Sequence, residues 1–283
     1  MTTPVIPAIT QKQVCAFLSP RPLDSHKGMF GTVAVIGGSN GMIGAALLAG
    51  RAALKLGAGC VHVGLLADNA SGVDNQYPEL MLHKAADALQ LHKLSIVAIG
   101  CGMGQSIAAQ KILQEALKLD TPLVLDADAL NLLAVHPELR SQLATRKACT
   151  VITPHPGEAA RLLGKSTTEV QASRAASALE LSRQFNCSVV LKGAGSLCVS
   201  REGKIWLNNT GNPGMSSPGM GDVLSGMIAA FIAQSLNADK AMLLAVHLHG
   251  AAGDALAQQQ AGIGMSATEV IEWARWLLNQ WNI

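Results

Sequence analysis

The stretch "TVAVIGGSNGMIGAALLAGRAALKLG", residues 32–57, predicts a strand, a glycine-rich loop and a helix in that order. Its first residues are apolar and largely β-branched, as in a buried strand, and the alanine- and leucine-rich segment after the glycines is typical of a helix. A second apolar strand, CVHVGL (60–65), follows directly. A strand, a helix and a further strand in close succession predict two parallel strands joined by a crossover helix.

The same alternation continues along the chain. Further strands are predicted at SIVAIG (95–100), PLVLDA (122–127) and CTVIT (149–153), with helices over 106–119, 157–163 and 167–185. Three strands in succession, SVVLKG, SLCVS and KIWLNN, precede helices over 220–234, over 238–258 and after a capping box, Ser266 to Glu269. This pattern predicts an α/β fold with a mostly parallel central sheet and helices on both faces. No linker or repeat divides the chain, so we predict a single domain over 1–283.

The composition limits the classes of function. Of the 283 residues, 49% are apolar, which is enough for a large core, and the net charge of +2 with no basic stripe argues against nucleic acid as a partner. Charge-free segments are interrupted by glycines or are too short to span a bilayer, and the N-terminus lacks the features of a signal peptide. Six scattered cysteines without a C-x-x-C pair indicate free thiols, and we expect a cytoplasmic protein.

Two segments resemble known nucleotide-binding motifs but differ from them at a required glycine. LLGKST (162–167) ends like a phosphate-binding P-loop, but Ala159 stands where the first glycine of that motif is needed. GGSNGMIG (37–44) has glycines after a strand, but their spacing differs from the G-x-G-x-x-G of dinucleotide-binding folds. Neither segment therefore predicts a site of these kinds.

The loop GNPGMSSPGMGDVLSG (211–226) carries a single charge, Asp222, where glycines lead into a helix. The first N–H groups of a helix are unpaired and attract anions, and glycines let an anion approach them closely. A carboxylate at this point can act as a general base while the N–H groups hold the charge that develops. The alternative is that Asp222 only complements the helix dipole, and its position alone does not decide between the two.

Three other loops follow predicted strands, at the edge where α/β sheets bind ligands. KGAGS (192–196) is either a hairpin turn or a glycine-lined bed for phosphates. TPHPGE (153–158) places Glu158 three residues after His155, in the first turn of a helix or in a binding site. DADALN (126–131) carries two acids, of which Asp128 is the expected N-cap of the next helix.

Taken together and in this order, these loops resemble the ribokinase-like superfamily, and within it the ADP/ATP-dependent NAD(P)H-hydrate dehydratase family. The resemblance covers residues 26–230 through HKGMFGTVAVIGGS, GMIGAALLAGRAALKLGAG, LVLDADALN, TPHPGE, VVLKGAGS and NPGMSSPGMGDVLSGMIAA. Residues 1–25 precede it as an N-terminal extension, and we expect the 283 residues to carry no epimerase domain, which many bacterial relatives have. The resemblance implies dehydration of the (S)-hydrate of NADH or NADPH, driven by ADP and releasing AMP and phosphate, whereas eukaryotic members prefer ATP.

The resemblance also implies roles for individual residues. Asp222 matches the catalytic base of the G-x-G-D motif and also touches the substrate. The substrate, hydrated nicotinamide, would lie against Ala45, Gly104 and His155, and Glu158 would help to place Mg²⁺. The residues that match the adenine-nucleotide site are Lys192, Gly193, Ala194, Gly195, Ser196 and Gly221.

Two departures from the family pattern are small. Ser196 stands where the family often has threonine and keeps the hydroxyl, and Pro218 replaces a small residue ahead of the GMGD loop. The expected ligands are thus hydrated NADH or NADPH, ADP or ATP as co-substrate, and Mg²⁺, with a homo-oligomer, often a tetramer in the family, and no nucleic acid or membrane partner. Two alternatives stay open: a vitamin- or thiazole-type kinase of the same fold, and a catalytically silent nucleotide-binding protein.

Overall fold

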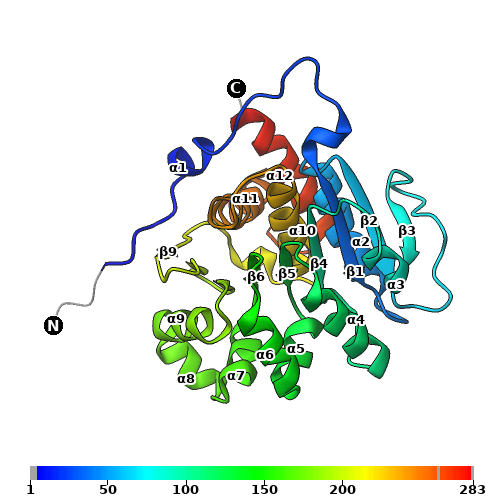
Figure 1. The fold of residues 1–283 in the computed structure, drawn as a ribbon. Helices are drawn as coiled ribbons and strands as arrows, with labels where there is room; N and C mark the ends of the chain where they lie inside the picture. Colours follow the sequence, from blue (N-terminus) through cyan, green and yellow to red (C-terminus); the bar gives the residue numbers. More distant parts are fainter. Residues whose placement is uncertain (1–4, 260–261, 282–283) are drawn as a thin grey trace.

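The computed structural model describes residues 5–259 and 262–281 and contains one nine-stranded sheet (Figure 1). The strands lie in the order β3-β2-β1-β4-β5-β6-β7-β8-β9, and those from β3 to β7 are all parallel. Their bounds are β1 Thr32–Gly37, β2 Cys60–Leu65, β3 Met81–Lys84, β4 Ile96–Ile99, β5 Leu123–Leu125, β6 Thr150–Ile152, β7 Ser188–Leu191, β8 Leu197–Val199 and β9 Ile205–Leu207. The predicted α/β fold with a mostly parallel sheet is confirmed.

Each face of the sheet is buried under its own group of helices because successive side chains of a strand point to opposite sides. Val33 and Val35 face the core formed with α2 (Ile43–Lys55), α10 (Met220–Ala233), α11 (Ala238–Gln259) and α12 (Ala267–Trp281). Ala34 and Ile36 face the opposite core. The helices there are α3 (Ala85–Leu89), α4 (Ile107–Lys118), α5 (Asp128–Val135), α6 (Pro137–Thr145), α7 (Pro156–Leu163), α8 (Thr167–Ala172) and α9 (Arg174–Phe185).

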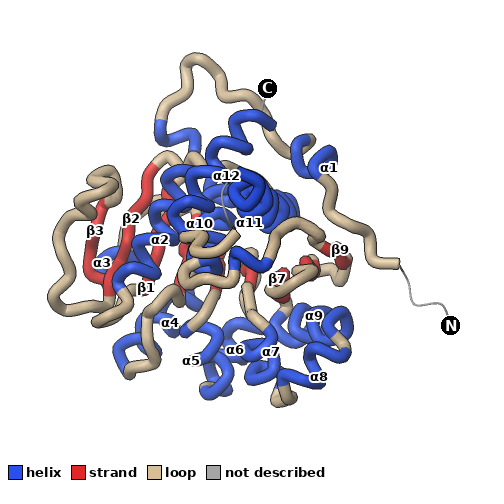
Figure 2. The backbone as a smooth tube through the Cα atoms, turned by 180° about the vertical axis from the view of Figure 1, so that it is seen from behind, coloured by secondary structure: helices blue, strands red, loops and turns tan. Residues whose placement is uncertain are grey.

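The last two strands reverse direction. β8 pairs antiparallel with β7, and β9 pairs antiparallel with β8, as expected for three strands joined by short turns. The N-terminal segment covers the outer edge of β9: the N–H of Leu207 donates to the Pro7 carbonyl and the N–H of Ile9 donates to the Leu207 carbonyl (Figure 2). The short helix α1 (Gln11–Cys15) then packs on α11, and 3-10 turns occur at η1 (Lys27–Phe30) and η2 (Pro213–Met215).

Several elements differ from the sequence-based expectation. The helix predicted over 167–185 is two helices, α8 and α9, which meet at Ser173. The short elements β3, α3 and α6 were not predicted, and of α5 only the start near Asp128 was. The capping box before α12 is present, with the Ser266 N–H donating to Glu269. All six cysteines are free. In the described part of the chain, no helix combines the length and hydropathy needed to cross a membrane.

Candidate active site

The loops predicted to carry function meet at the carboxyl end of the parallel strands, and backbone hydrogen bonds lock them together. The N–H of Ser39 in the loop after β1 donates to the Gly102 carbonyl in the loop after β4, at 2.7 Å. The N–H of Lys192 after β7 donates to the Pro154 carbonyl after β6, at 2.9 Å. Asp126, after β5, lies between these two pairs of loops because its N–H donates to Ile99 of β4. The loops at the carboxyl ends of the strands from β1 to β7 are therefore linked to one another.

Asp222 lies in the first turn of α10, directly above this edge. The residue before the helix, Gly219, has φ +89°, a conformation that glycine adopts easily. Burial, followed by the charge of Asp126, raises the pKa of Asp222 to about 6, although Cys101 and Lys192 oppose the shift. A carboxylate with a pKa near neutrality, at the positive end of a helix, is suited to accept a proton during a reaction.

A cavity of about 530 Å³ opens beside the start of α10. Its volume is in the range of small-molecule sites. All six residues predicted to bind nucleotide line it, namely Lys192, Gly193, Ala194, Gly195, Ser196 and Gly221, together with residues from 208–216, α10 and α11. Asp222 does not line the cavity but directly follows Gly221, so the proposed base lies at its border.

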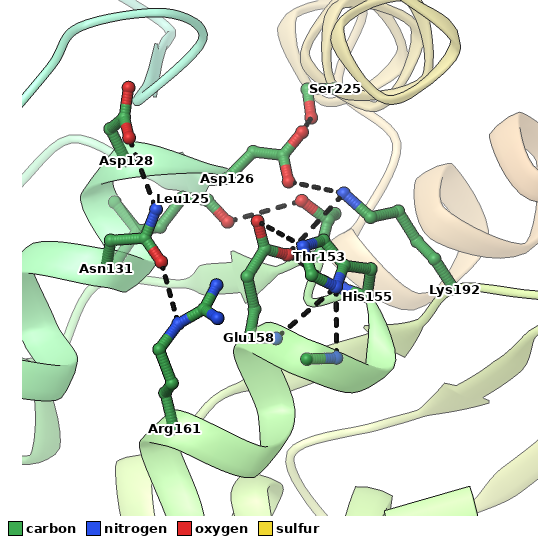
Figure 3. Close-up of polar contacts among 11 residues, drawn as sticks. Leu125, Asp126, Asp128, Asn131, Thr153, His155, Glu158, Arg161, Lys192 and Ser225 are labelled. Atoms are coloured by element: carbon green, nitrogen blue, oxygen red, sulfur yellow. Dashed lines mark hydrogen bonds and ion pairs between the residues drawn. The ribbon is translucent and has the colours of Figure 1, made fainter. Parts of the chain in front are cut away.

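Lys192 connects this cavity with a buried acidic pair. Its Nζ donates to Asp126 Oδ1 at 2.6 Å and lies 4.0 Å from Glu158 Oε2 (Figure 3). Burial disfavours the ammonium charge, but Asp126 and Glu158 outweigh burial and raise the pKa of Lys192. The side chain is therefore a permanent cation at the border of the cavity, which suits it to hold phosphate.

Glu158 and His155 form the N-terminal cap of α7. The Glu158 Oε2 accepts the His155 N–H at 2.7 Å, and the His155 Nδ1 accepts the Gly157 N–H at 3.0 Å. Burial raises the pKa of Glu158 to about 7, against the opposing charge of Lys192. Burial and the charges of Lys192 and Arg161 lower the pKa of His155, so the ring is neutral near pH 7 and leaves Nδ1 free to accept.

The three residues predicted to line the nicotinamide site occupy the same sheet edge but different loops. Ala45 lies in the first turn of α2, facing the loop after β4, since a Cβ built on Gly102 would come within 3.0 Å of the Ala45 Cβ. Gly104 lies on that loop, with φ +71°, and its N–H donates to Asp128 Oδ2 at 2.9 Å. His155 lies farther along, after β6. None of the three lines the nucleotide-side cavity.

Asp128 does not have the capping role expected from the sequence. The residue that precedes α5 is Ala127, with φ +48°, and Asp128 is the first residue of the helix. Its carboxylate instead accepts the Gly104 N–H and the Asn131 side-chain amide. The prediction was wrong because the carboxylate finds a donor on the loop after β4, which no local pattern reveals.

The residues of the site that were not predicted include Asp126, Ser225, Cys101 and His249. Asp126 is 2% exposed, and Ser225 on α10 donates to its Oδ2 at 2.8 Å. The Cys101 thiol lies within 4.8 Å of carboxylate oxygens of Asp126 and Asp222, and burial, followed by these two charges, raises its pKa well above the usual range. His249 lines the cavity, and burial and Lys192 lower its pKa to about 4. The acid of DADALN was the available signal for Asp126; the others had none.

Comparisons with known proteins identify the family to which the chain is similar. The family model for NAD(P)H-hydrate dehydratase matches residues 33–275. The chain is 43% identical over 265 residues to the ADP-dependent (S)-NAD(P)H-hydrate dehydratase of Neisseria meningitidis, covering 92% of this chain and 89% of that protein. It is 40% identical to the bifunctional NAD(P)H-hydrate repair enzyme of Escherichia coli, of which the match covers 52%.

A solved structure has the same fold over its full length. The crystal structure of the ADP/ATP-dependent NAD(P)H-hydrate dehydratase from Bacillus subtilis, co-crystallised with ATP and Mg²⁺, superimposes with a TM-score of 0.85 at 31% identity. The match covers 98% of this chain and 99% of that one. A ribokinase-like superfamily protein from Enterococcus faecalis superimposes with a TM-score of 0.84 at 25% identity. The chain belongs to the NAD(P)H-hydrate dehydratase family, with the ribokinase-like fold.

Proposed function

We propose that this chain is an ADP-dependent (S)-NAD(P)H-hydrate dehydratase, a lyase that returns hydrated NADH or NADPH to the reduced cofactor with release of AMP and phosphate. The observation that carries the proposal is the position of Asp222. It is a partly buried carboxylate with a pKa of about 6, next to Gly221 at the border of the cavity that Lys192 also lines. The near full-length similarity to the Neisseria enzyme supports the choice of substrate.

The first half of the reaction makes the hydroxyl of the hydrate a better leaving group. Hydroxide leaves poorly, so the hydroxyl oxygen attacks the terminal phosphorus of ADP, and the P–O bond to AMP breaks. Asp222 accepts the hydroxyl proton as that bond forms. Lys192 and the unpaired N–H groups at the start of α10 stabilise the charge on the transferred phosphoryl group.

The second half is an elimination. Phosphate leaves with the electrons of the C–O bond, and the lone pair of the ring nitrogen stabilises the cationic ring that results. Loss of a proton from the adjacent ring carbon restores the double bond. The products are thus NADH or NADPH, AMP, phosphate and one released proton, and no oxidant or reductant is consumed.

Magnesium is part of the proposal, and the residues at this edge fit it through water rather than by direct ligation. Carboxylate oxygens suit Mg²⁺, but both oxygens of Asp126 already accept hydrogen bonds. Of the two Glu158 oxygens, Oε2 accepts the His155 N–H and Oε1 lies 3.3 Å from His155 Nε2. A water-mediated contact with Glu158 therefore agrees with the indirect role expected for it. When bound to the nucleotide phosphates, the ion would neutralise part of their negative charge.

The test is an absorbance assay with hydrated NADH and hydrated NADPH, each with ADP or ATP. With ADP and Mg²⁺, the near-ultraviolet absorbance of the reduced ring should return, and AMP should appear in step with it. A kinase of this fold would instead leave the hydrate unchanged and phosphorylate a thiazole or pyrimidine alcohol. A silent binding protein would do neither, so either outcome would reject the lyase.

We further propose that the enzyme acts in the cytoplasm as a homo-oligomer, the assembly that the family resemblance implies. Light scattering on the purified protein measures the mass of the particle against the 29.3 kDa of one chain. A particle of that single mass at micromolar concentration would reject the oligomer.

A further inference from the structure

Asp126 links Lys192, which follows β7, to the helix α10, which carries Asp222. It follows β5 and is only 2% exposed. Its Oδ1 accepts from Lys192 Nζ at 2.6 Å, and its Oδ2 accepts from Ser225 Oγ at 2.8 Å (Figure 3). One buried carboxylate thus links the side chain after β7 to a hydroxyl of α10.

Both partners of Asp126 lie next to reacting groups. Lys192 lines the nucleotide-side cavity, and Ser225 lies three residues after Asp222, on the same side of α10. A Cβ built on Gly221 would lie 3.3 Å from Lys192 Nζ and 3.5 Å from Asp126 Oδ2, so the ion pair lies directly against the start of the helix. A shift of Asp126 would therefore move the phosphate-binding cation and the base relative to each other.

We propose that Asp126 is a positioning residue that fixes Lys192 and the first turns of α10 in one geometry, so that the phosphoryl group and the general base are aligned. This inference rests on the proposed function, because it requires a phosphate at Lys192 and a base at Asp222. Misplacement of a reacting group by about 1 Å can lower a rate by about 100-fold. Carboxylate oxygens of Asp126 and Asp222 lie within 4.8 Å of each other, and in this proposal Asp126 does not touch the substrate.

The charge of Asp126 has a second effect on the base. The charged and titratable groups that face Asp222 are Asp126 after β5, Lys192 after β7, Cys101 after β4 and Asp128 on α5. Next to burial, Asp126 is the largest contribution that raises the pKa of Asp222, and Lys192 and Cys101 act in the opposite direction. Loss of the Asp126 charge should therefore make Asp222 a weaker base.

The decisive variant is Asp126→Asn in the full chain. The amide keeps the size of the side chain, but it has one acceptor oxygen where the carboxylate has two, and its NH2 group cannot accept, so the hydrogen bond from Lys192 or the one from Ser225 is lost or reversed. We expect kcat for hydrated NADH to fall about 10- to 100-fold. Calorimetry should give an ADP affinity equal to or tighter than that of the wild type, because a negative charge near the phosphates is removed. The acidic limb of the pH–rate profile should move to lower pH.

Two further variants separate position from charge. Ser225→Ala removes the tie to α10 but keeps the Asp126 charge, so kcat should fall while the acidic limb stays in place. Glu115→Gln makes the same change in net charge at an exposed position on α4 and should alter none of these quantities. The melting temperature and far-ultraviolet circular dichroism of each variant report whether it folds.

The outcomes distinguish this inference from the proposed function. A folded Asp126→Asn protein with the kcat and pH profile of the wild type would overturn the inference, as would kcat and ADP affinity falling by the same factor. If Asp126→Asn does not fold, the kcat of Ser225→Ala decides, and a wild-type value overturns the inference. A wild-type protein that converts no hydrate under any condition would instead reject the proposed function.

Discussion

At the scale of the residue, Asp222 has an unusual pKa because of what surrounds it. Burial disfavours its ionised form, and the buried charge of Asp126 adds repulsion. Below pH 6 much of the carboxyl group is protonated and cannot act as a base. Turnover should therefore rise with pH through a midpoint of about 6.

The substitution Asp222→Asn should abolish the base and leave the nucleotide site intact. We expect the turnover rate to fall about 10²- to 10⁴-fold, the usual effect of losing a general base. Calorimetry should find ADP binding nearly unchanged, since Gly221 and Lys192, but not Asp222, line the cavity. Loss of ADP binding together with activity would mean that Asp222 positions the nucleotide instead.

The same variant should be more stable than the wild type above pH 6. The raised pKa means that the folded protein holds a proton that the unfolded chain releases between about pH 4 and 6, so ionisation of Asp222 destabilises the fold as pH rises. The amide that replaces the carboxyl group cannot ionise, and the gain should be on the order of 1–3 kcal/mol at pH 8 and vanish near pH 4. Equal unfolding free energies at pH 8 would contradict the raised pKa.

The sequence predicted the residues of the nucleotide cavity better than it predicted the contacts of Asp126. The KGAGS loop and GMGD are contiguous motifs, and all the nucleotide residues predicted from them line one cavity. Asp126 was visible as an acid after a strand, but its partners Lys192 and Ser225 lie 66 and 99 residues away. Only the folded sheet brings these three together, so no local pattern could reveal the contact.

At the scale of the element, the start of α10 combines glycines with unpaired backbone N–H groups. Gly221 is the second residue of the helix, and a side chain there would point at the Lys192–Asp126 pair. Alanine favours a helix over glycine by about 1 kcal/mol, so the absence of a side chain at this position lowers the intrinsic stability of the helix. The Lys192–Asp126 pair leaves little room for a side chain there, and the proposed approach of ADP to the backbone would need the same space.

The substitution Gly221→Ala should weaken ADP binding at least about 10-fold without destabilising the protein, because its methyl group would occupy space beside Lys192 Nζ. Gly44 is a matched control. It is also the second residue of a helix, α2, and a Cβ built there meets nothing within 4 Å. Gly44→Ala should keep the ADP affinity of the wild type. Equal affinities for the two variants would show that ADP does not approach the start of α10.

Element predictions succeeded where the apolar pattern was strong and bounded by turns, and failed where it was weak or continued across a break. The long helices α10 and α11 and the run of three strands from β7 to β9 follow the predicted ranges closely. The break at Ser173 was missed because the apolar periodicity continues across it, and α8 begins with its own capping box at Ser166 and Glu169. The strand β3 has only four residues, and its half-exposed side chains give no strong alternation.

At the scale of the whole molecule, the parallel sheet assembles a site from loops that span most of the chain. The segments after β1, β4, β5, β6 and β7 meet at one edge, and α10 places its first turn above them. The order of these motifs in the sequence was enough to predict the fold. The resemblance had assigned the nucleotide and the hydrated nicotinamide to two sets of residues, and in the fold the nucleotide set lines one cavity while Ala45, Gly104 and His155 lie outside it.

The central claim is that the enzyme phosphorylates the hydroxyl of the hydrate before eliminating it, and an isotope label tests this directly. Hydrated NADH carrying ¹⁸O in that hydroxyl is converted with ADP, and the released phosphate is analysed by mass spectrometry. Because the C–O bond breaks after phosphoryl transfer, each phosphate should carry one ¹⁸O, in step with NADH and AMP. Recovered substrate that still holds its label excludes exchange with water. Unlabelled phosphate, with the ¹⁸O found in water, would contradict the account.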